Sequence, residues 1–213
     1  MSSDVLVTTP AQRQTEPHAE AVSRNRRQQA TFRKVLAAAM ATLREKSYAD
    51  LTVRLVAARA KVAPATAYTY FSSKNHLIAE VYLDLVRQVP CVTDVNVPMP
   101  IRVTSSLRHL ALVVADEPEI GAACTAALLD GGADPAVRAV RDRIGAEIHR
   151  RITSAIGPGA DPGTAFALEM AFFGALVQAG SGTFTYHEIA DRLGYVVGLI
   201  LAGANEPSTG GSE

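Results

Sequence analysis

Apolar residues recur at intervals of three and four along most of the chain, a spacing that places them on one face of an α-helix. No stretch shows the sustained alternation of apolar and polar residues that is typical of a half-buried strand. A first long helix is expected over about residues 26–46, and the second half of the chain predicts five more, separated by proline and glycine. Those five are expected at about residues 101–116, 118–130, 135–156, 162–180 and 185–203. The pattern therefore predicts an all-α protein.

Two much shorter helices are expected in the stretch 51–74. Thr52 can cap the first of them, and Pro64 suits the first position of the second, where a missing N–H does no harm. The second helix carries small side chains and two tyrosines, Tyr68 and Tyr70, so that one face has little bulk. Two short helices joined by a tight turn predict a helix-turn-helix motif whose second helix enters the major groove of DNA.

A further helix is expected after this motif, with a serine as its N-cap and Lys74 in its first turn. A lysine in the first turn does not stabilise the helix macrodipole. Its presence there therefore favours a phosphate as the partner of Lys74. Three arginines, Arg24, Arg26 and Arg27, precede the first long helix. They fit contact with phosphates or the minor groove beside the motif, or equally a solvated helix start.

The charge is divided between the two parts of the chain. Residues 1–90 hold 13 Lys and Arg against 7 Asp and Glu, and the remainder holds 8 against 14, which gives +6 and −6 within a formal net charge of zero for the 213 residues. Such a division suits a protein with one end that binds a polyanion. Ordinary scatter of charge is the alternative.

Composition also divides the chain into segments. Residues 1–23 are polar and aperiodic and are expected to form a disordered arm, and residues 205–213 a disordered tail. Between them we expect a DNA-binding domain over residues 24–72, with three helices including the helix-turn-helix, and a helical bundle over residues 73–204 for ligand binding and dimerisation.

Nothing at the N-terminus resembles a signal peptide. The most apolar stretch, Ala165–Ala179, is interpreted as too short to span a bilayer, and it contains Glu169 and Gln178. Cys91 and Cys124 lie far apart and in no metal-binding pattern. We therefore expect a soluble, cytoplasmic protein without membrane contact.

The last two predicted helices indicate a homodimer. The helix at about 162–180 is apolar almost all round, and the helix at about 185–203 has a wide apolar stripe, so both need cover on more than one side. A second copy of the chain is the simplest cover in a protein of this size. Gly194 and Gly198, four residues apart, would allow close approach of helices, although packing within one chain explains them as well.

The middle helices are expected to enclose a pocket for a small lipophilic effector, because such sites are mostly apolar with a few polar groups. Taken singly, each candidate lining residue fits an ordinary core position better than a ligand site. The candidates are His109, Cys124, Leu128, Met170, Phe173 and Gln178.

The sequence offers little for catalysis. The five histidines form no pair at metal-ligand spacing, and no Gly-x-Ser-x-Gly elbow occurs. The glycine-rich segment 157–163 follows no strand and has the wrong spacing for a phosphate-binding loop, so we interpret it as a connector. No enzyme, cofactor or metal is therefore expected.

The helix-turn-helix region resembles the TetR/AcrR family of bacterial transcriptional regulators over about residues 25–88. The resemblance is carried by Phe32 and by the run Leu51-Thr52-Val53-Arg54 through Val62-Ala63-Pro64-Ala65-Thr66-Ala67-Tyr68-Thr69-Tyr70-Phe71-Ser72-Ser73-Lys74. Three positions depart from the usual pattern. Lys61 replaces a turn glycine, Ala63 replaces a capping serine, and Ala67 replaces a bulky aliphatic residue. We expect a less stable turn and a slimmer internal contact.

The resemblance implies a set of DNA contacts on the two short helices and at the start of the next one. It also implies a dimer built from the last two helices, and it makes Phe71 a hydrophobic anchor. The implied DNA-binding residues are Thr52, Arg54, Pro64, Ala65, Thr66, Tyr68, Tyr70 and Lys74. For the two tyrosines core packing is the alternative, and at most one of them is expected to be buried.

Together these features predict a homodimeric, ligand-responsive regulator of transcription. A repressor released from a palindromic operator by a lipophilic effector is the favoured interpretation. An activator or a DNA binder without a ligand is the first alternative. A helical lipid-binding or enzyme-like protein that never contacts DNA is the second.

Overall fold

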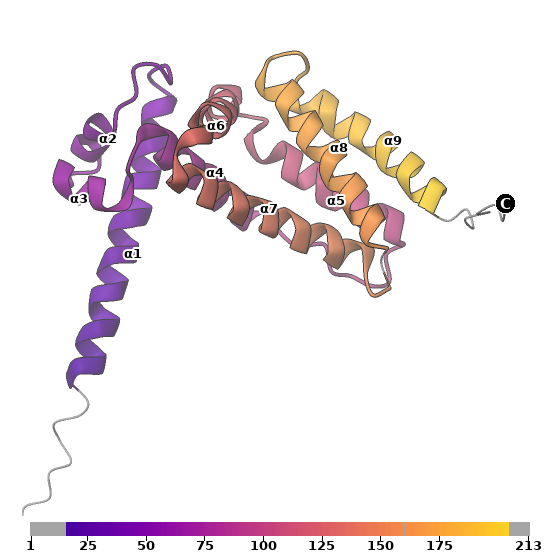
Figure 1. Ribbon diagram of the computed structural model, residues 1–213, viewed down its shortest axis with the longest axis horizontal. Coiled ribbons are helices and arrows are strands. Elements are labelled where there is room, and N and C mark those ends of the chain that lie inside the picture. The colour runs from indigo at the N-terminus through magenta and orange to yellow at the C-terminus, as the bar shows by residue number, and fades with distance from the viewer. Residues whose placement is uncertain (1–15, 160, 205–213) are drawn as a thin grey trace, which may run out of the picture.

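The computed structural model describes residues 16–159 and 161–204, and this part of the chain is helical without strands (Figure 1). The helices near the N-terminus are α1 (Glu16–Leu43), α2 (Val53–Arg59), α3 (Pro64–Tyr70) and α4 (Lys74–Gln88). They are followed by α5 (Met99–Ala111), the 3₁₀ turn η1 (Leu112–Val114), α6 (Pro118–Asp130) and a second turn, η2 (Gly131–Ala133). The chain then forms α7 (Pro135–Ile156), α8 (Pro162–Gly180) and α9 (Tyr186–Ala204). The predicted all-α class is confirmed.

Helix α1 begins about ten residues earlier than the sequence pattern predicted. The expected disordered arm over residues 1–23 is therefore wrong for residues 16–23, which belong to α1; residues 1–15 lie outside the described part. Pro17 falls in the first turn of α1, where proline is tolerated. No glycine or further proline interrupts α1, and its first half projects away from the rest of the protein (Figure 1).

The N-terminal helices share a small core around Phe71, which is fully buried. Val35, Leu36 and Leu43 of α1 are also buried. Phe32 stacks on Phe71 with the ring centroids 5.1 Å apart. This core fixes α2 and α3 against α1, and it confirms Phe71 as the anchor of the motif.

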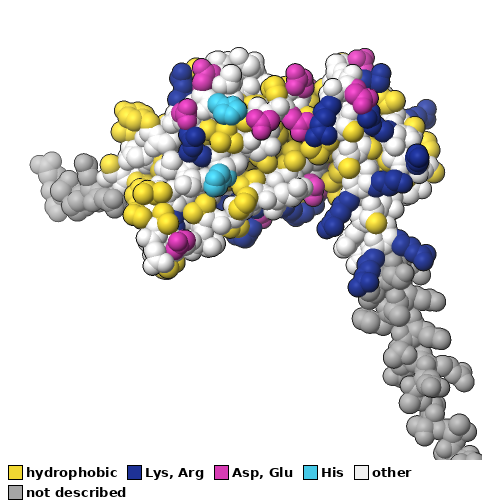
Figure 2. Space-filling view, turned by 180° about the vertical axis from the view of Figure 1, so that it is seen from behind, with side chains coloured by type: hydrophobic (Ala, Val, Ile, Leu, Met, Phe, Trp, Pro, Cys, Tyr) yellow, Lys and Arg dark blue, Asp and Glu magenta, His cyan; other side chains and the backbone are white. Residues whose placement is uncertain are grey.

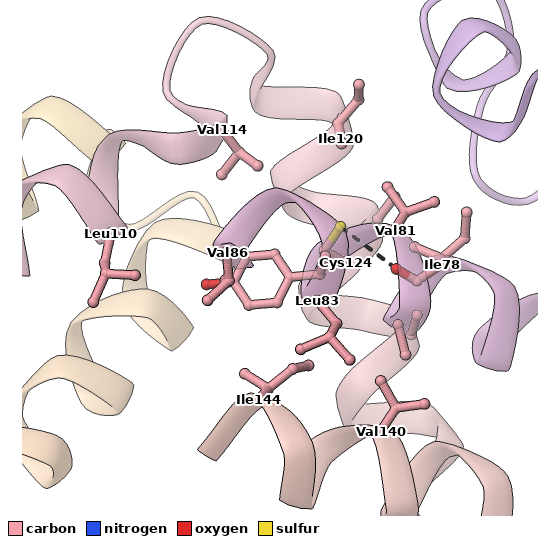
Figure 3. Packing of buried hydrophobic residues seen from close by; sticks show 14 of the residues in the cluster. Ile78, Val81, Leu83, Val86, Leu110, Val114, Ile120, Cys124, Val140 and Ile144 are labelled. Carbon is pink, nitrogen blue, oxygen red and sulfur yellow. Dashed lines mark hydrogen bonds between the residues drawn. The ribbon is translucent and has the colours of Figure 1, made fainter. Parts of the chain in front are cut away.

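Helix α4 joins the two halves of the molecule, because it packs against α1 on one side and against α6 and α7 on the other. Its buried face includes Ile78, Val81 and Leu83, and these meet Cys124 of α6 and Val140 of α7 in the central core (Figure 3). Further close pairs in the C-terminal bundle are α5 with α9, α8 with α9, α5 with α7, α6 with α8 and α7 with α8.

Two predicted elements differ from the structure. The helix expected at about residues 101–116 ends as an α-helix at Ala111 and continues only as the 3₁₀ turn η1. The apolar stretch that was interpreted as too short for a bilayer is part of α8, whose 19 residues are long and apolar enough, by length and composition, to cross a membrane. Interior helices of globular proteins meet the same criterion, so α8 alone is weak evidence for a membrane span.

Candidate functional site

The helix-turn-helix has the local chemistry that its sequence predicts. The Thr52 side chain caps α2 by accepting a hydrogen bond from the Leu55 N–H, 3.1 Å away. Pro64 occupies the first turn of α3, and Ala63 before it makes no side-chain capping bond. The turn is closed by a 2.9 Å hydrogen bond from the Val62 N–H to the Ala57 carbonyl. The motif is thus held mainly by backbone bonds and by its buried apolar residues.

Lys61 lies in the left-handed region with a φ of 52°, the only non-glycine residue in the described part of the chain to do so. The turn needs a backbone conformation that glycine adopts without strain and lysine does not. The departure from glycine at this position was noted in the sequence, and the structure gives it a physical consequence. Ala67, another of the three departures inside the motif, is fully buried, so its small size sets how closely α3 approaches its neighbours.

Six of the eight predicted DNA-binding residues have exposed side chains on the helix-turn-helix. They are Thr52, Arg54, Pro64, Ala65, Thr66 and Tyr68. Tyr68 keeps 45% of its surface exposed although it is a large aromatic residue. Lys and Arg side chains are concentrated over this part of the molecule (Figure 2). The exposed face of α3 therefore combines small groups that can approach a base edge with a hydroxyl that can donate to a phosphate.

The other two predicted contacts, Tyr70 and Lys74, are half-buried and have partners within the chain. The Tyr70 ring packs edge-on against Phe32, with 6.1 Å between centroids. The Lys74 ammonium donates a 3.2 Å hydrogen bond to the Tyr48 carbonyl and lies 4.5 Å from the centre of the Tyr48 ring. These contacts give Lys74 a structural reason for its place in the first turn of α4, which the sequence argument had sought only in a phosphate.

A network of polar side chains connects the end of the recognition helix to α7. Ser73 caps α4, and its hydroxyl donates a 2.9 Å hydrogen bond to Asp134, which itself caps α7. The Ser72 N–H donates to the Nδ1 atom of His76 at 3.2 Å. The Nε2 atom of His76 lies 3.6 Å from the Glu80 carboxylate, which also accepts a hydrogen bond from Arg143. The caps of α4 and α7 are therefore bonded to each other, and a buried carboxylate follows one helical turn later.

The C-terminal bundle encloses a cavity of about 390 Å³, within the usual range for small-molecule sites. Its wall comes from α4, α6, α7, α8 and the start of α9, and Arg141 is its only charged residue. The lining residues are Tyr82, Gly121, Cys124, Thr125, Leu128, Leu129, Arg141, Ile144, Phe173, Leu176, Val177 and Tyr186. At Gly121 a Cβ would collide with the end of the Tyr186 side chain as it lies in this structure.

The cavity brings together three of the six predicted ligand-binding residues, Cys124, Leu128 and Phe173. Burial raises the pKa of the Cys124 thiol to about 12, so this side chain behaves as an apolar group in the wall. The structure places the other three predicted residues away from this cavity. His109 is exposed on α5 and lines no described cavity, while Met170 and Gln178 line a separate groove on the outer side of α8 and α9.

Sequence reasoning missed Tyr82, Arg141 and Tyr186 as lining residues. Tyr82 sits in an apolar stretch of α4 and has the pattern of a core residue. Its hydroxyl, however, is the one buried side-chain polar atom in the described part of the chain without a hydrogen-bond partner. Burial raises the pKa of the hydroxyls of both Tyr82 and Tyr186. The sequence around Tyr82 carries no signal that separates it from an ordinary core residue.

The outer face of α8 and α9 exposes large apolar side chains that no other described helix covers. They are Phe166, Met170, Tyr195 and Leu199, each between 56% and 72% exposed. Gly174 and Gly198 have open space where a Cβ would stand. Apolar patches are visible on the C-terminal bundle in Figure 2. An exposed apolar face of this kind marks an interaction surface.

The N-terminal domain is similar to a known family of proteins. Residues 35–81 match the profile of bacterial regulatory proteins of the tetR family. That match includes the end of α1, all of α2 and α3 and the first half of α4.

Solved structures match over both halves of the chain. A TetR transcriptional regulator from Rhodococcus sp. RHA1 has a TM-score of 0.69 and 21% sequence identity, and the match covers 83% of this chain and 98% of that one. FadR from Thermus thermophilus, a TetR-family repressor solved with lauroyl-CoA, has a TM-score of 0.61 and 17% identity over 85% and 99% of the two chains. FadR from Bacillus subtilis, solved with stearoyl-CoA, has a TM-score of 0.54 and 13% identity over 81% and 98%. At these identities the likeness is one of fold.

Proposed function

We propose that this chain, whose N-terminal domain belongs to the tetR family of bacterial regulatory proteins, is a cytoplasmic, ligand-responsive repressor of transcription. It binds a palindromic operator as a homodimer and leaves the DNA when a small lipophilic effector occupies the C-terminal cavity. The observation that carries the proposal is the exposed face of α3 on a domain that matches the family profile. We propose no catalytic reaction for this chain.

The homodimer is supported by the exposed apolar face of α8 and α9. One recognition helix alone buries too little surface for tight specific binding, since specific complexes bury about 1,000–2,500 Å² of protein surface. Two copies joined through this face would present two recognition helices. At a separation of about 34–36 Å these would match successive turns of the major groove.

A lipophilic effector is supported by the wall of the cavity, in which Arg141 is the only charge. The two FadR structures contain acyl-CoA molecules, so ligands with long apolar chains are bound by proteins of this fold. In this chain the cavity of about 390 Å³ would take an apolar body of limited size.

Communication between cavity and DNA would pass through α4 and α7. Tyr82 of α4 and Ile144 of α7 both line the cavity. Glu80 precedes Tyr82 by two residues in α4, and Arg143 directly precedes Ile144 in α7. Arg143 donates a hydrogen bond to Glu80. A ligand that moves α4 relative to α7 would therefore strain this pair and shift the recognition helix. Effector and operator would then favour different conformations, which is the requirement for allosteric release.

The direct test is the binding of the purified protein to DNA from the region upstream of its own coding sequence. Fluorescence anisotropy at several salt concentrations should show tight binding that weakens steeply with salt, because phosphate contacts release counterions. Tyr68→Phe should weaken binding about threefold to tenfold through the loss of one hydrogen bond. Ser154→Ala, which removes an exposed hydroxyl from the end of α7, is the control and should bind like the wild type. Equal affinity of the Tyr68 variant and the wild type would contradict the assigned contact, and salt-independent binding would contradict the proposed function.

A further inference from the structure

The part of α1 that precedes the core carries a cationic face made by Arg26, Arg27, Arg33 and Lys34. Residues 25–34 hold these four cations and no Asp or Glu, and all four side chains are exposed. Six other arginines of the described chain are each paired with a carboxylate: Arg44, Arg59, Arg108, Arg143, Arg150 and Arg151. Among the described residues no such pair includes the cations of α1. The fold therefore leaves this face free for an anionic partner.

Helical geometry gathers the four cations on one side of α1. Arg26 and Arg33 are seven residues apart, as are Arg27 and Lys34, and seven residues are close to two turns of the helix. The buried residue Ala39 lies on the opposite side of α1, toward the core. The cations thus form two neighbouring rows that face solvent.

The cationic face begins next to the recognition helix. Phe32 of α1 stacks on Phe71 and contacts Tyr70 at the end of α3. Helix α3 has seven residues and is about 10 Å long, so DNA held by its exposed face is also close to this part of α1. From Phe32 the helix extends over residues 16–31, about 24 Å at 1.5 Å per residue. Figure 2 shows Lys and Arg side chains where α1 leaves the body of the protein.

The phosphate backbone of DNA is the partner that this face fits. A duplex carries one negative charge per about 1.7 Å of its axis, and guanidinium groups can donate two parallel hydrogen bonds to a phosphate. An anionic membrane surface fits less well, because helices that bind there have a large apolar face. Residues 25–31 carry no large apolar side chain.

We propose that the cationic face of α1 binds the phosphate backbone of DNA beside the segment that α3 reads. This inference rests on the proposed function, since it adds a second contact surface to the same DNA complex. It goes further by placing phosphate contacts outside the helix-turn-helix. Phosphate contacts carry no sequence information, so this face strengthens binding to every duplex and leaves the preference for the operator unchanged.

The test measures affinity against salt concentration by fluorescence anisotropy on two duplexes of equal length. One is DNA from the region upstream of the coding sequence, and the other has a random sequence. Arg26→Gln/Arg27→Gln and Arg33→Gln/Lys34→Gln should each lower the slope of log affinity against log salt by about 1.8, which is about 0.9 per lost phosphate contact. The decrease should be the same on both duplexes.

The matched control is Arg87→Gln/Arg150→Gln, which removes two exposed cations far from the helix-turn-helix. Arg87 lies in the last turn of α4, and Arg150 lies in the second half of α7. This variant should keep the slope of the wild type. Arg26→Lys/Arg27→Lys retains both charges in α1 and should keep most of the slope as well.

Urea unfolding and far-ultraviolet circular dichroism control for the fold. The replaced side chains in α1 have no ion-pair partner among the described residues, and glutamine has a helix propensity close to that of arginine. Both glutamine variants of α1 should therefore unfold like the wild type. A lower slope together with unchanged unfolding assigns the effect to the lost charge.

The inference is overturned if both glutamine variants of α1 keep the slope of the wild type, or if the control variant loses as much. If they keep the slope while the wild type binds the upstream DNA selectively, the α1 contact fails and the proposed function stands. If their slope falls but the wild type shows no preference for the upstream DNA, the operator fails and the α1 contact stands. Absence of any binding to DNA by the wild type refutes both.

Discussion

Glu80 of α4 accepts a hydrogen bond from Arg143 of α7, and the two side chains differ sharply in exposure, 8% for Glu80 and 44% for Arg143. The carboxylate is thus buried at the boundary between the DNA-binding domain and the bundle, whereas the guanidinium closes it off from solvent. His76, one turn earlier on α4, reaches the same carboxylate. This pair links the helix that follows the recognition helix to a helix of the cavity wall.

Removing the charge of Glu80 should lower stability and reduce coupling. Glu80→Gln leaves an amide against Arg143 and His76, and we expect a loss of about 1–3 kcal/mol in the free energy of unfolding, measured with urea. Glu45→Gln, which alters the exposed pair with Arg59, should cost much less, because solvent screens an exposed ion pair. Effector-induced release of DNA should also weaken in Glu80→Gln. A variant as stable as the wild type would show that the pair contributes nothing.

The same pair makes the free energy of unfolding depend on pH in the acid range. Burial raises the pKa of Glu80, but hydrogen bonds from His76 and Arg143 outweigh it, so that the pKa lies below the ordinary 4.5. The pKa of Asp134 is lowered as well, by the Ala136 N–H and the Ser73 hydroxyl. A lowered folded-state pKa stabilises the protein above the unfolded value, and this contribution is lost as pH falls through the folded value. The free energy of unfolding should therefore fall below about pH 4.5, and less steeply in Glu80→Gln.

Much of the helix-turn-helix was predictable because its determinants are local. Thr52 as a cap, Pro64 in a first turn and the strained turn at Lys61 depend on residues a few positions away. The missed start of α1 also has a local explanation, because residues 16–23 are polar and lack the apolar periodicity from which the helices were predicted. Helix existence and most boundaries therefore followed from the order of residues alone.

The cavity was harder to predict because its wall depends on how five helices are rotated about their axes. Cys124 and Phe173 face it, while Met170, three residues before Phe173, faces the outer side of α8. Helical periodicity cannot decide between two apolar faces of one helix. Tyr82 was hidden for a related reason, because a tyrosine that lines a cavity and one in a packed core have the same pattern in the sequence.

Replacing Lys61 by glycine should stabilise the protein. A non-glycine residue in the left-handed region costs about 1–3 kcal/mol, and the extra flexibility of glycine in the unfolded chain offsets about 0.5–1 kcal/mol of the gain. We expect Lys61→Gly to raise the free energy of unfolding by about 1 kcal/mol, measured by urea titration. Lys61→Ala removes the same charge but keeps a Cβ, so it should show no gain. If Lys61→Gly and Lys61→Ala had the same free energy of unfolding, the left-handed backbone at residue 61 would not be a source of strain.

Lys74 should contribute to both stability and DNA binding. Lys74→Ala deprives the Tyr48 carbonyl of its donor, and we expect a loss of about 1 kcal/mol in unfolding experiments. If the ammonium also contacts a phosphate, the slope of log affinity against log salt should decrease by about 0.9. Arg54→Ala, an exposed residue without an ion-pair partner among the described residues, should change the slope without changing stability. An unaltered slope in Lys74→Ala would leave only the structural role.

The apolar face of α8 and α9 should control the oligomeric state. Leu199 is 56% exposed on this face, and a glutamate there would bring a charge into the proposed dimer interface, where burial without a partner is costly. Leu199→Glu should raise the dimer dissociation constant at least about tenfold, which corresponds to about 1.4 kcal/mol, as measured by analytical ultracentrifugation. Val95→Glu adds the same charge at another exposed apolar residue, in the connection between α4 and α5, and should leave the dimer intact. A Leu199 variant that associates as tightly as the wild type would mean that the copies meet through a different surface. The spacing of the two recognition helices would then have to be derived again from that surface.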